Sequence, residues 1–254
     1  MIKFAKIMNF YYFKIMNKLK ISIVSYSNSL PFVFGLENFL DKKYFSLHSD
    51  IPSVCAEKLI NKKVEIALIP VASLKKIKNY NLISNFCIAS NKKVFSVLLL
   101  SERPLKEIKN IYLDYQSQSS INLVKILSRE FWKIKVKFLN AKFGYESKIK
   151  SDTAGVVIGD RTFSMVEKYP FVYDLSEEWH KYTNLPFVFA VWVSNVKLGN
   201  EFIKKFNYAL QKGIKNIENH KNLYIKNYLQ KYISYNLDKE KIKAMNLFLS
   251  KIIN

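Results

Sequence analysis

Three turns rich in Ser, Asn, Asp and Gly are the places where small-molecule chemistry could occur in this sequence. They span residues 25–29, 117–120 and 159–160, and each follows a short apolar run and precedes a helical pattern. Hydroxyls, side-chain amides and free backbone N–H groups therefore collect at helix N-termini, where the helix dipole favours anions. The same residue types also act as ordinary helix N-caps, so one turn alone identifies no site. Three such turns around one cleft would suit a small polycarboxylate.

The rest of the sequence alternates short β-branched runs with helical patterns, which is typical of βα units on parallel sheets. In the first half we expect strands at residues 21–24, 45–48, 64–69, 86–90 and 94–100, and helices at residues 31–39 and 52–60, the second capped by Ser53. In the second half we expect strands at residues 111–113, 136–139, 154–158 and 187–193, helices at residues 119–131 and 162–168, and two or three helices within residues 200–254. The pattern predicts the α/β class.

The order of these elements predicts two lobes without a flexible linker. No Pro-, Gly- or Ser-rich stretch separates the two α/β sets, so we expect the strands at residues 94–100 and 187–193 to cross between them. Residues 16–97 together with 190–254 would form lobe one, and residues 98–189 would form lobe two. Bilobed folds of this kind bind ligands in the cleft between the lobes.

The composition excludes several classes of protein and of site. Hydrophobic residues make up 49% and charged residues 24% of the 254 residues, which is globular and not disordered. Cys55 and Cys87 form no C-x-x-C pair, and the three histidines are too scattered for a zinc site. Gly155 and Gly159 flank an apolar strand and give neither a G-x-G-x-x-G loop nor a P-loop. We therefore expect neither a metal nor an organic cofactor.

The net charge of +21, from 41 Lys and Arg against 20 Asp and Glu, is high enough to suggest a polyanionic partner. Only three of the basic residues are arginines, although arginine is the residue that reads phosphates and bases best. Lysine is accompanied here by much Asn, Ile, Phe and Tyr, which A/T-rich codons encode. We interpret the charge as genomic composition and expect no nucleic-acid partner, while a basic field could still attract a small anion.

Residues 1–15 resemble a targeting segment only superficially. Lys14 and Lys18 interrupt the apolar stretch, and no small-x-small cleavage site follows. We expect a dispensable extension or an over-called start codon ahead of Met16, the alternatives being an interfacial helix or a degenerate export signal. No apolar run approaches the roughly 20 residues of a membrane-spanning helix, so we predict a cytoplasmic protein without membrane insertion.

Several motifs resemble one enzyme family. The segment S-Y-S-N-S-L-P at residues 25–31 is similar to the S-Y-L-N-x-x-P signature of chorismate dehydratases, which act in the futalosine route to menaquinone. The resemblance covers roughly residues 18–195. It continues in order through A-L-I-P-V at residues 67–71, C-I-A-S at 87–90, V-F-S-V at 94–97, L-D-Y-Q-S at 113–117, I-G-D at 158–160, D-L-S-E-E-W at 174–179 and L-P-F-V-F-A-V-W at 185–192.

This resemblance implies a two-lobed, periplasmic-binding-protein-like fold of type II with the ligand site in the interlobe cleft. It also implies a lyase that removes water from chorismate to give 3-[(1-carboxyvinyl)oxy]benzoate without metal or organic cofactor. Loss of the C4 hydroxyl and the C3 proton aromatises the ring, so the product supplies much of the driving force. The site would chiefly hold two carboxylates, orient the hydroxyl and exclude water.

The resemblance also assigns roles to particular residues. Asn28 matches the family's active-site asparagine and could donate to the leaving hydroxyl. Ser96 matches a serine expected to bind one carboxylate, and Ser119 and Ser120 match a Thr-Ser pair assigned to the other. Asp160 could orient the ligand or only cap its helix. Because an amide is a poor base, a carboxylate of the substrate is a hypothetical proton acceptor.

Three further positions need comment. Tyr26 and Phe189 are expected to pack and not to contact the ligand. Gln118 stands where family members commonly have the arginine of an S-R-T-S motif, which puts activity in doubt if that arginine contacts the substrate.

Two related functions remain as alternatives. A solute-binding protein without catalysis shares the fold but would normally carry an export signal. A 1,4-dihydroxy-6-naphthoate synthase of the same pathway is thought to rely on a histidine, and His48, His180 and His220 lie in none of the three polar turns.

Overall fold

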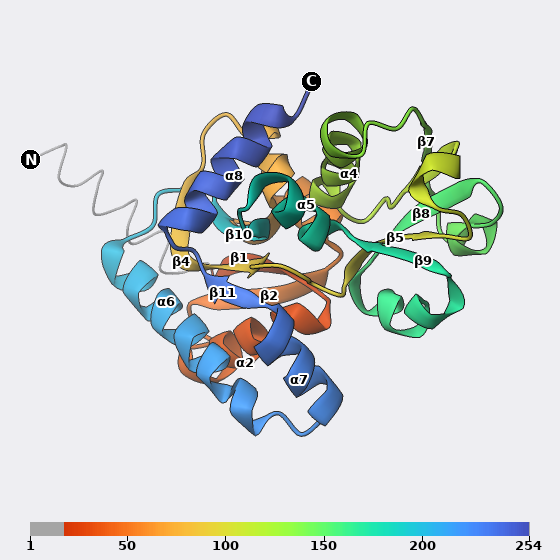
Figure 1. Cartoon of the computed structure of the whole chain (residues 1–254). Coiled ribbons are helices and arrows are strands. Elements are labelled where there is room, and N and C mark those ends of the chain that lie inside the picture. Colours follow the sequence, from red (N-terminus) through yellow and green to blue (C-terminus); the bar gives the residue numbers. More distant parts are fainter. Residues whose placement is uncertain (1–17, 254) are drawn as a thin grey trace, which may run out of the picture.

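Two mixed β-sheets, one in each lobe, form the framework of residues 18–253, the part of the chain that the computed structural model describes (Figure 1). The predicted extension at residues 1–15 lies outside the described residues. Helices pack around both sheets, and the two lobes lie side by side in Figure 1. The α/β class and the two-lobed arrangement are as the sequence predicts.

The first sheet has the strand order β11-β4-β10-β3-β1-β2, with β10 antiparallel to both of its neighbours. Strands β3 and β10 are buried along their whole length, which explains their unbroken apolar sequences. The strands are β1 (Leu19–Val24), β2 (Phe45–Asp50), β3 (Ile66–Pro70), β4 (Asn81–Ser90), β10 (Phe187–Ser194) and β11 (Ser234–Asn236).

The helices that accompany the first sheet come from both ends of the chain. They are α2 (Leu30–Phe39), α3 (Pro52–Ile60), α6 (Asn200–Lys215), α7 (Leu223–Tyr232) and α8 (Lys239–Lys251), with short 3₁₀ turns η1 (Ser27–Ser29), η2 (Val71–Lys76) and η8 (Asn216–Asn219). Within residues 18–253, no helix combines the length and the apolar character needed to cross a membrane.

The second sheet has the strand order β7-β6-β8-β5-β9. Its strands are β5 (Val97–Ser101), β6 (Asn110–Leu113), β7 (Lys137–Asn140), β8 (Thr153–Ile158) and β9 (Phe171–Asp174). Its helices are α4 (Gln118–Ile126), extended by the π-helical turn η4 (Leu127–Phe131), and α5 (Leu175–Thr183). Its 3₁₀ turns are η3 (Leu105–Glu107), η5 (Tyr145–Lys148), η6 (Gly159–Ser164) and η7 (Val166–Lys168).

The chain passes between the sheets through irregular segments, whereas the sequence predicted crossing strands. Strand β5 pairs only with β8 and β9 of the second sheet, and β10 pairs only with β3 and β4 of the first. The crossings are therefore residues 91–96 and 184–186. Phe187–Phe189, which the predicted boundary assigned to lobe two, belong to the first sheet. An apolar run indicates a buried strand but not which sheet it joins.

Other local predictions differ from the structure in instructive ways. Ser53 is not the N-cap of α3, because Ile51 holds that position and Pro52 begins the helix. The Ser53 N–H instead donates to the Gln116 carbonyl of the second lobe at 2.9 Å. Residues 162–168 form 3₁₀ turns and not a regular helix, and the short elements β9, α5 and β11 were not predicted.

Two glycines allow α2 and α6 to pack at unusually close range. A Cβ added to Gly213 would lie 1.8 Å from the Pro31 carbonyl oxygen, and one added to Gly35 would lie 2.1 Å from the Ala209 carbonyl oxygen. Both contacts are with backbone, which cannot rotate away as a side chain can. Because α2 directly follows η1, this packing also fixes where the first polar turn lies.

We expect Gly213→Ala to lower the free energy of unfolding by at least about 1–3 kcal/mol, the usual cost of overpacking a well-packed contact. The matched control is Gly199→Ala at the N-cap of α6, where an added Cβ meets nothing within 4 Å and φ is −69°. That change should stay within about 0.5 kcal/mol. Urea denaturation of both variants measures the difference, and equal stabilities would contradict the close packing.

Candidate functional site

A small cavity, partly open to solvent, lies where the carboxyl ends of strands from both lobes meet. The lining combines apolar side chains with a few hydroxyls and one amide. It consists of Val24, Tyr26, Asn28, Pro52, Pro70, Ile88, Val94, Ser96, Val97, Ser117, Ser120, Ile158, Gly159, Phe189 and Ala190.

The topology explains why polar groups reach this cavity. Parallel strands β1 and β3 of the first sheet and β6 and β8 of the second end here, and helical turns follow each of them. Ser117 is the N-cap of α4, where its Oγ accepts the Ser120 N–H at 3.4 Å. This cap occupies the Ser120 N–H, whereas the N–H groups of Gln118 and Ser119 have no acceptor within the helix and can face an anion.

Three of the five predicted site residues line this cavity together. Asn28 is half-buried in η1; its Oδ1 accepts from Ser29 Oγ at 3.3 Å, and its carbonyl accepts from Tyr235 Oη at 3.0 Å. Ser96 is buried just before β5, and Ser120 is buried in the first turn of α4. The structure thus brings together residues that lie up to 92 positions apart in the sequence, from Asn28 to Ser120.

Ser119 lies outside the cavity, although it was predicted to bind a carboxylate. Its Oγ donates to the Phe189 carbonyl at 3.0 Å and accepts the Ala72 N–H at 3.2 Å. The hydroxyl is fully buried and its hydrogen-bonding capacity is used by the backbone of lobe one. Ser119 therefore ties α4 to the first lobe.

Asp160 also lies outside the cavity, on the surface of the turn η6. Its carboxylate accepts from the Ser27 N–H at 3.2 Å and from Ser27 Oγ at 3.0 Å. It does not cap its own turn, whose N-cap is Ile158. Asp160 thus joins the lobes, a geometry that neither of its predicted roles, ligand orientation or capping, describes.

Tyr26 makes a second bridge between the lobes at the same place. Its hydroxyl donates to Gln116 Oε1, and its ring packs on Gly159, where an added Cβ would lie only 2.6 Å from the ring. Gly159 has φ +72°, so both its conformation and its lack of a side chain are required. Tyr26 and Phe189, predicted to pack, do pack, but they also line the cavity. Gln118 is half-buried at the start of α4, outside the lining.

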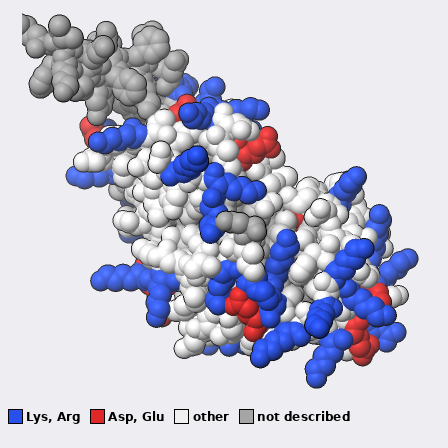
Figure 2. All heavy atoms as spheres, turned by 90° about the horizontal axis from the view of Figure 1, so that it is seen from above, with Lys and Arg blue, Asp and Glu red and all other residues white. Residues whose placement is uncertain are grey.

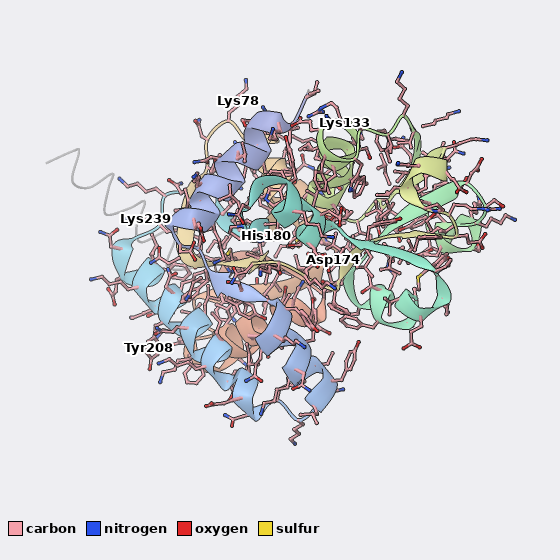
Figure 3. The ribbon with its side chains drawn as sticks, in the orientation of Figure 1. Lys78, Lys133, Asp174, His180, Tyr208 and Lys239 are labelled. Carbon is pink, nitrogen blue, oxygen red and sulfur yellow. The ribbon has the colours of Figure 1, made fainter. Side chains whose placement is uncertain are left out.

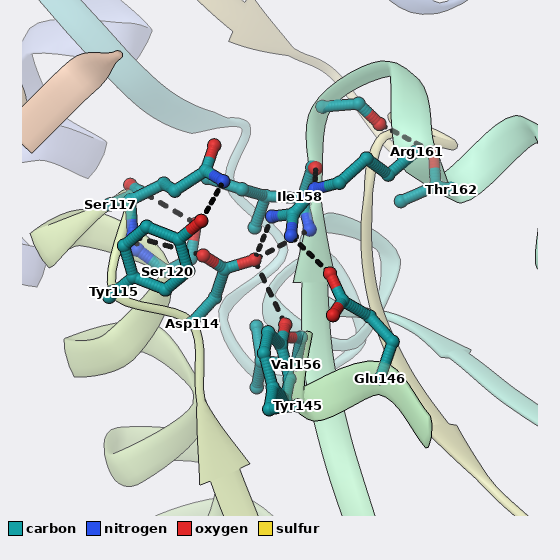
Figure 4. Close-up of polar contacts among 12 residues, drawn as sticks. Asp114, Tyr115, Ser117, Ser120, Tyr145, Glu146, Val156, Ile158, Arg161 and Thr162 are labelled. Atoms are coloured by element: carbon teal, nitrogen blue, oxygen red, sulfur yellow. Dashed lines mark hydrogen bonds and ion pairs between the residues drawn. The ribbon is translucent and has the colours of Figure 1, made fainter. Parts of the chain in front are cut away.

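Asp114 organises the turns of the second lobe from a completely buried position (Figure 4). Its carboxylate pairs with Arg161 and accepts from Tyr145 Oη at 3.0 Å, from the Ile158 N–H at 3.2 Å and from the Gln116 N–H at 2.9 Å. Burial raises the pKa of Asp114, while Arg161 opposes that rise. The network holds the ends of β6 and β8 in register, and with them the two polar turns.

Asp174 plays the corresponding part at the junction of the lobes (Figure 3). One carboxylate oxygen caps α5, and the other accepts the Val94 N–H at 2.9 Å and the Phe95 N–H at 2.8 Å. Phe95 has φ +64°, a conformation that non-glycine residues rarely adopt. Burial raises the pKa of Asp174 to about 6 despite these donors. The carboxylate therefore holds a strained loop whose next residue is Ser96.

The cavity wall contains no strong acid or base. None of its lining residues is Asp, Glu, His, Lys, Arg or Cys, and the histidines lie elsewhere. The titratable Tyr26 has its pKa raised by burial and donates its proton to Gln116. Within residues 18–253, no group of three His, Cys, Asp or Glu side chains is placed to hold a metal ion. The arrangement can bind and orient an anion through neutral donors and helix dipoles.

The basic charge of the protein lies on its surface. Figure 2 shows Lys and Arg side chains spread over the visible face, with acidic side chains and broad uncharged areas between them. A nucleic-acid-binding surface would need these side chains to form a continuous band. On this face they do not.

Sequence reasoning missed the residues that position the site. Ser117 was assigned to a polar turn but not to the cavity, and Asp114 and Asp174 were noted only as parts of motifs. Tyr228, whose Oη lies 2.7 Å from Ser96 Oγ, was not noted at all. Isolated buried carboxylates in a basic chain are a signal that could have singled out Asp114 and Asp174. No local pattern identifies Tyr228.

Comparisons with known proteins show which family this chain resembles. A family model described as "Menaquinone biosynthesis" matches residues 19–253. The chorismate dehydratase of Campylobacter jejuni is 28% identical over 190 residues, covering 72% of this chain and 71% of the relative. The chorismate dehydratase of Thermus thermophilus is 28% identical over 186 residues, covering 66% of each chain.

Similar solved structures confirm the predicted fold. Protein AF1704 of Archaeoglobus fulgidus superposes with a TM-score of 0.69 at 11% identity, covering 92% of this chain and 96% of that one. A Candida albicans protein with the generic periplasmic binding protein fold gives 0.60 at 14% identity, covering 92% and 89%. The aliphatic sulphonate binding protein SsuA of Escherichia coli gives 0.59 at 13% identity, covering 92% of each. The fold is two-lobed and periplasmic-binding-protein-like.

We expect Asp174→Asn to lower the free energy of unfolding by about 1–3 kcal/mol at pH 7, the cost of leaving buried donors unsatisfied. The amide keeps one acceptor but turns its own N–H₂ toward backbone N–H groups. Urea denaturation measures the effect. Glu37→Gln on the exposed surface of α2 is the control and should change stability by less than about 0.5 kcal/mol; equal losses in the two variants would contradict the clamp.

The pH dependence of the unfolding free energy of wild type and Asp174→Asn gives an independent check. Because the folded pKa of Asp174 is about 6 and its ordinary value is 3.8, the native state binds more protons between these values. The additional stability that wild type gains from proton binding at this group is present below pH 4 and is lost as the pH rises through 6. The stability difference between wild type and Asp174→Asn should therefore shrink from pH 4 to pH 6.5. A difference that grows over this range would contradict the raised pKa.

Proposed function

The chain belongs to the menaquinone-biosynthesis family, and we propose that it is a chorismate dehydratase, a lyase that eliminates water from chorismate to give 3-[(1-carboxyvinyl)oxy]benzoate. The observation that carries the proposal is the composition of the cavity: Asn28, Ser96 and Ser120 meet in it, and no acid–base side chain accompanies them. Such a wall suits a reaction in which the substrate supplies most of the reactivity.

The elimination demands little acid–base chemistry from the protein. The C3–H and C4–O bonds of chorismate break, a C3=C4 double bond forms, and the proton and hydroxide leave as water. The ring becomes aromatic, and an anion forming at C3 is delocalised through the ring diene toward the ring carboxylate. The protein must therefore chiefly orient the substrate and stabilise the departing hydroxide.

Asn28 is our candidate for the group that acts on the C4 hydroxyl. Its Oδ1 is engaged by Ser29 Oγ, which directs the amide N–H₂ away from Ser29 as the available donor. A donor at the leaving oxygen stabilises the charge that develops there as the C–O bond breaks. Asn28 would therefore affect turnover more than binding.

The serines are our candidates for carboxylate binding. Ser96 would hold one carboxylate, and Ser120 with the N-terminal N–H groups of α4 would hold the other, the helix dipole offsetting the negative charge. Ser117 lines the same wall and caps the same helix. We therefore propose Ser117 for the carboxylate-binding role that the resemblance implied for Ser119.

We propose that a carboxylate of the substrate accepts the C3 proton. The support is the absence of Asp, Glu, His, Lys and Cys from the cavity lining, together with the raised pKa of Tyr26 and its donation to Gln116. Neutral donors around a carboxylate leave it more basic than an ion pair with Arg would.

Two contacts between the lobes support the exclusion of water. Asp160 receives both the N–H and the hydroxyl of Ser27, and Tyr26 donates to Gln116. We assign to Asp160 the role of holding the lobes closed over the substrate, in place of ligand contact. A closed site removes the competing solvent that would weaken neutral hydrogen bonds.

The alternatives lack a supporting residue or are separable by assay. A 1,4-dihydroxy-6-naphthoate synthase would need a histidine in the site, and His48, His180 and His220 do not line the cavity. A solute-binding protein would bind chorismate and return it unchanged. Incubation with chorismate followed by detection of the aromatic product distinguishes all three.

We expect Asn28→Ala to reduce kcat for chorismate by about 10²–10³, the usual effect of removing one donor at a developing negative charge. Ser96→Ala should instead mainly raise KM, because a carboxylate contact exists before and during the reaction. Steady-state kinetics with the aromatic product as readout separates the two effects.

Asn38→Ala, an exposed asparagine on α2, is the matched control and should leave both constants within twofold of wild type. Melting curves of all three variants show whether any loss is one of folding. Near wild-type turnover by Asn28→Ala would contradict its catalytic role, and absence of aromatic product from wild type would contradict the proposed function.

A further inference from the structure

A tyrosine from the C-terminal part of the chain is hydrogen-bonded to the site. Tyr228 lies in α7, and its Oη is 2.7 Å from Ser96 Oγ, across 132 positions of sequence. Tyr228 is 4% exposed and Ser96 is 2% exposed, so water does not compete for this bond. Tyr228 does not itself line the cavity and can act on a bound molecule only through its neighbours.

Helix α7 packs against η1, the turn that carries Asn28. The Tyr228 hydroxyl donates to Ser96 Oγ. Burial raises the pKa of Tyr228, which keeps that proton in place at neutral pH.

The direction of the Tyr228–Ser96 hydrogen bond determines whether the Ser96 hydroxyl can donate to a ligand. Ser96 Oγ accepts from Tyr228, and among the described residues no acceptor for the Ser96 hydroxyl hydrogen is present. A serine hydroxyl has one hydrogen, so this one is free to point into the cavity that Ser96 lines. A donor that is itself hydrogen-bonded through its oxygen is both fixed in place and polarised.

Aromatic packing holds the Tyr228 ring rigidly. Tyr224, Tyr228 and Tyr232 recur every four residues and share one face of α7. The Tyr228 ring meets Phe163 edge-on with centroids 5.0 Å apart, and the Tyr232 ring lies 4.5 Å from Phe95, the residue before Ser96. The aromatic contacts of this helix face therefore hold the Tyr228 hydroxyl in one position.

We propose that Tyr228 is a positioning residue that fixes the Ser96 hydroxyl as a donor to a carboxylate of the substrate. This inference rests on the proposed function and extends it to a helix that contributes nothing to the cavity wall. It assigns to α7 a part in substrate binding that its position outside the cavity does not reveal.

The test begins with Tyr228→Phe, which keeps the ring and its packing and removes only the hydroxyl. We expect kcat/KM for chorismate to fall about tenfold, the equivalent of one well-formed hydrogen bond, with KM raised and kcat lowered. A variant that merely unfolded in part would lose kcat with KM unchanged. The matched control is Tyr232→Phe, which lies one turn further along the same face; its hydroxyl makes no hydrogen bond within the described residues. It should stay within twofold of wild type.

A double-mutant cycle with Ser96→Ala tests whether Tyr228 acts through Ser96. In the Ser96→Ala background, Tyr228→Phe should change KM less than twofold, because the group that Tyr228 positions is gone. A purely structural tyrosine would cost the same factor in both backgrounds.

Each outcome either supports or overturns the role proposed for Tyr228. Active wild type, a tenfold loss in Tyr228→Phe and non-additivity with Ser96→Ala support the inference. Active wild type with Tyr228→Phe within twofold, or with additive effects on KM, overturns the inference and leaves the proposed function standing. Wild type that forms no aromatic product overturns both.

Discussion

The buried carboxylate of Asp174 fixes the place where the two lobes meet. It receives four backbone N–H groups, two from the start of α5 and two from the segment that crosses between the sheets. One of the residues it holds, Phe95, has a left-handed conformation that would relax without this clamp. Ser96 follows directly, so the direction in which its hydroxyl points depends on a charge that never reaches the cavity. Burial and satisfied donors give the clamp its rigidity.

Asp114, at the end of β6, is a second buried carboxylate in the same lobe, and the pair explains why the cavity is neutral. Charged groups near the site are committed to each other or to the backbone: Arg161 pairs with Asp114 and Glu146, and Asp160 binds Ser27. What faces the cavity is what these charges position, namely hydroxyls, an amide and helix N-termini. A protein with a net charge of +21 thus presents a site without a cation. The surface charge can attract an anion, and dipoles then hold it.

Local patterns in the sequence predicted most of the elements, and the family resemblance singled out three residues that line the cavity. Strands such as β1 and β3 and helices such as α2 follow directly from apolar runs and helical periodicity. The roles of Ser119 and Asp160 could not be predicted, because a hydroxyl or carboxylate in a polar turn faces a ligand or the opposite lobe depending on the tertiary register. Tyr228 was out of reach for a similar reason: its partner is 132 residues away and its own segment reads as an ordinary amphipathic helix. Sequence indicates which groups end a strand, whereas packing decides what they meet.

The neutrality of the cavity also constrains the chemistry. An arginine or lysine on a substrate carboxylate would stabilise the ionised form in the ground state and lower its basicity. That would hinder the proposed reaction, in which the same carboxylate accepts a proton, and it would strengthen ground-state binding without lowering the barrier. In this proposal, neutral donors such as Ser96 and Ser120 hold the group while leaving its lone pairs reactive. The apolar remainder of the wall, including Phe189 and Ile158, keeps out the water that would otherwise compete for that proton. On this view the clamps at Asp114 and Asp174 matter because precise neutral dipoles can replace charge only when the backbone holds them still.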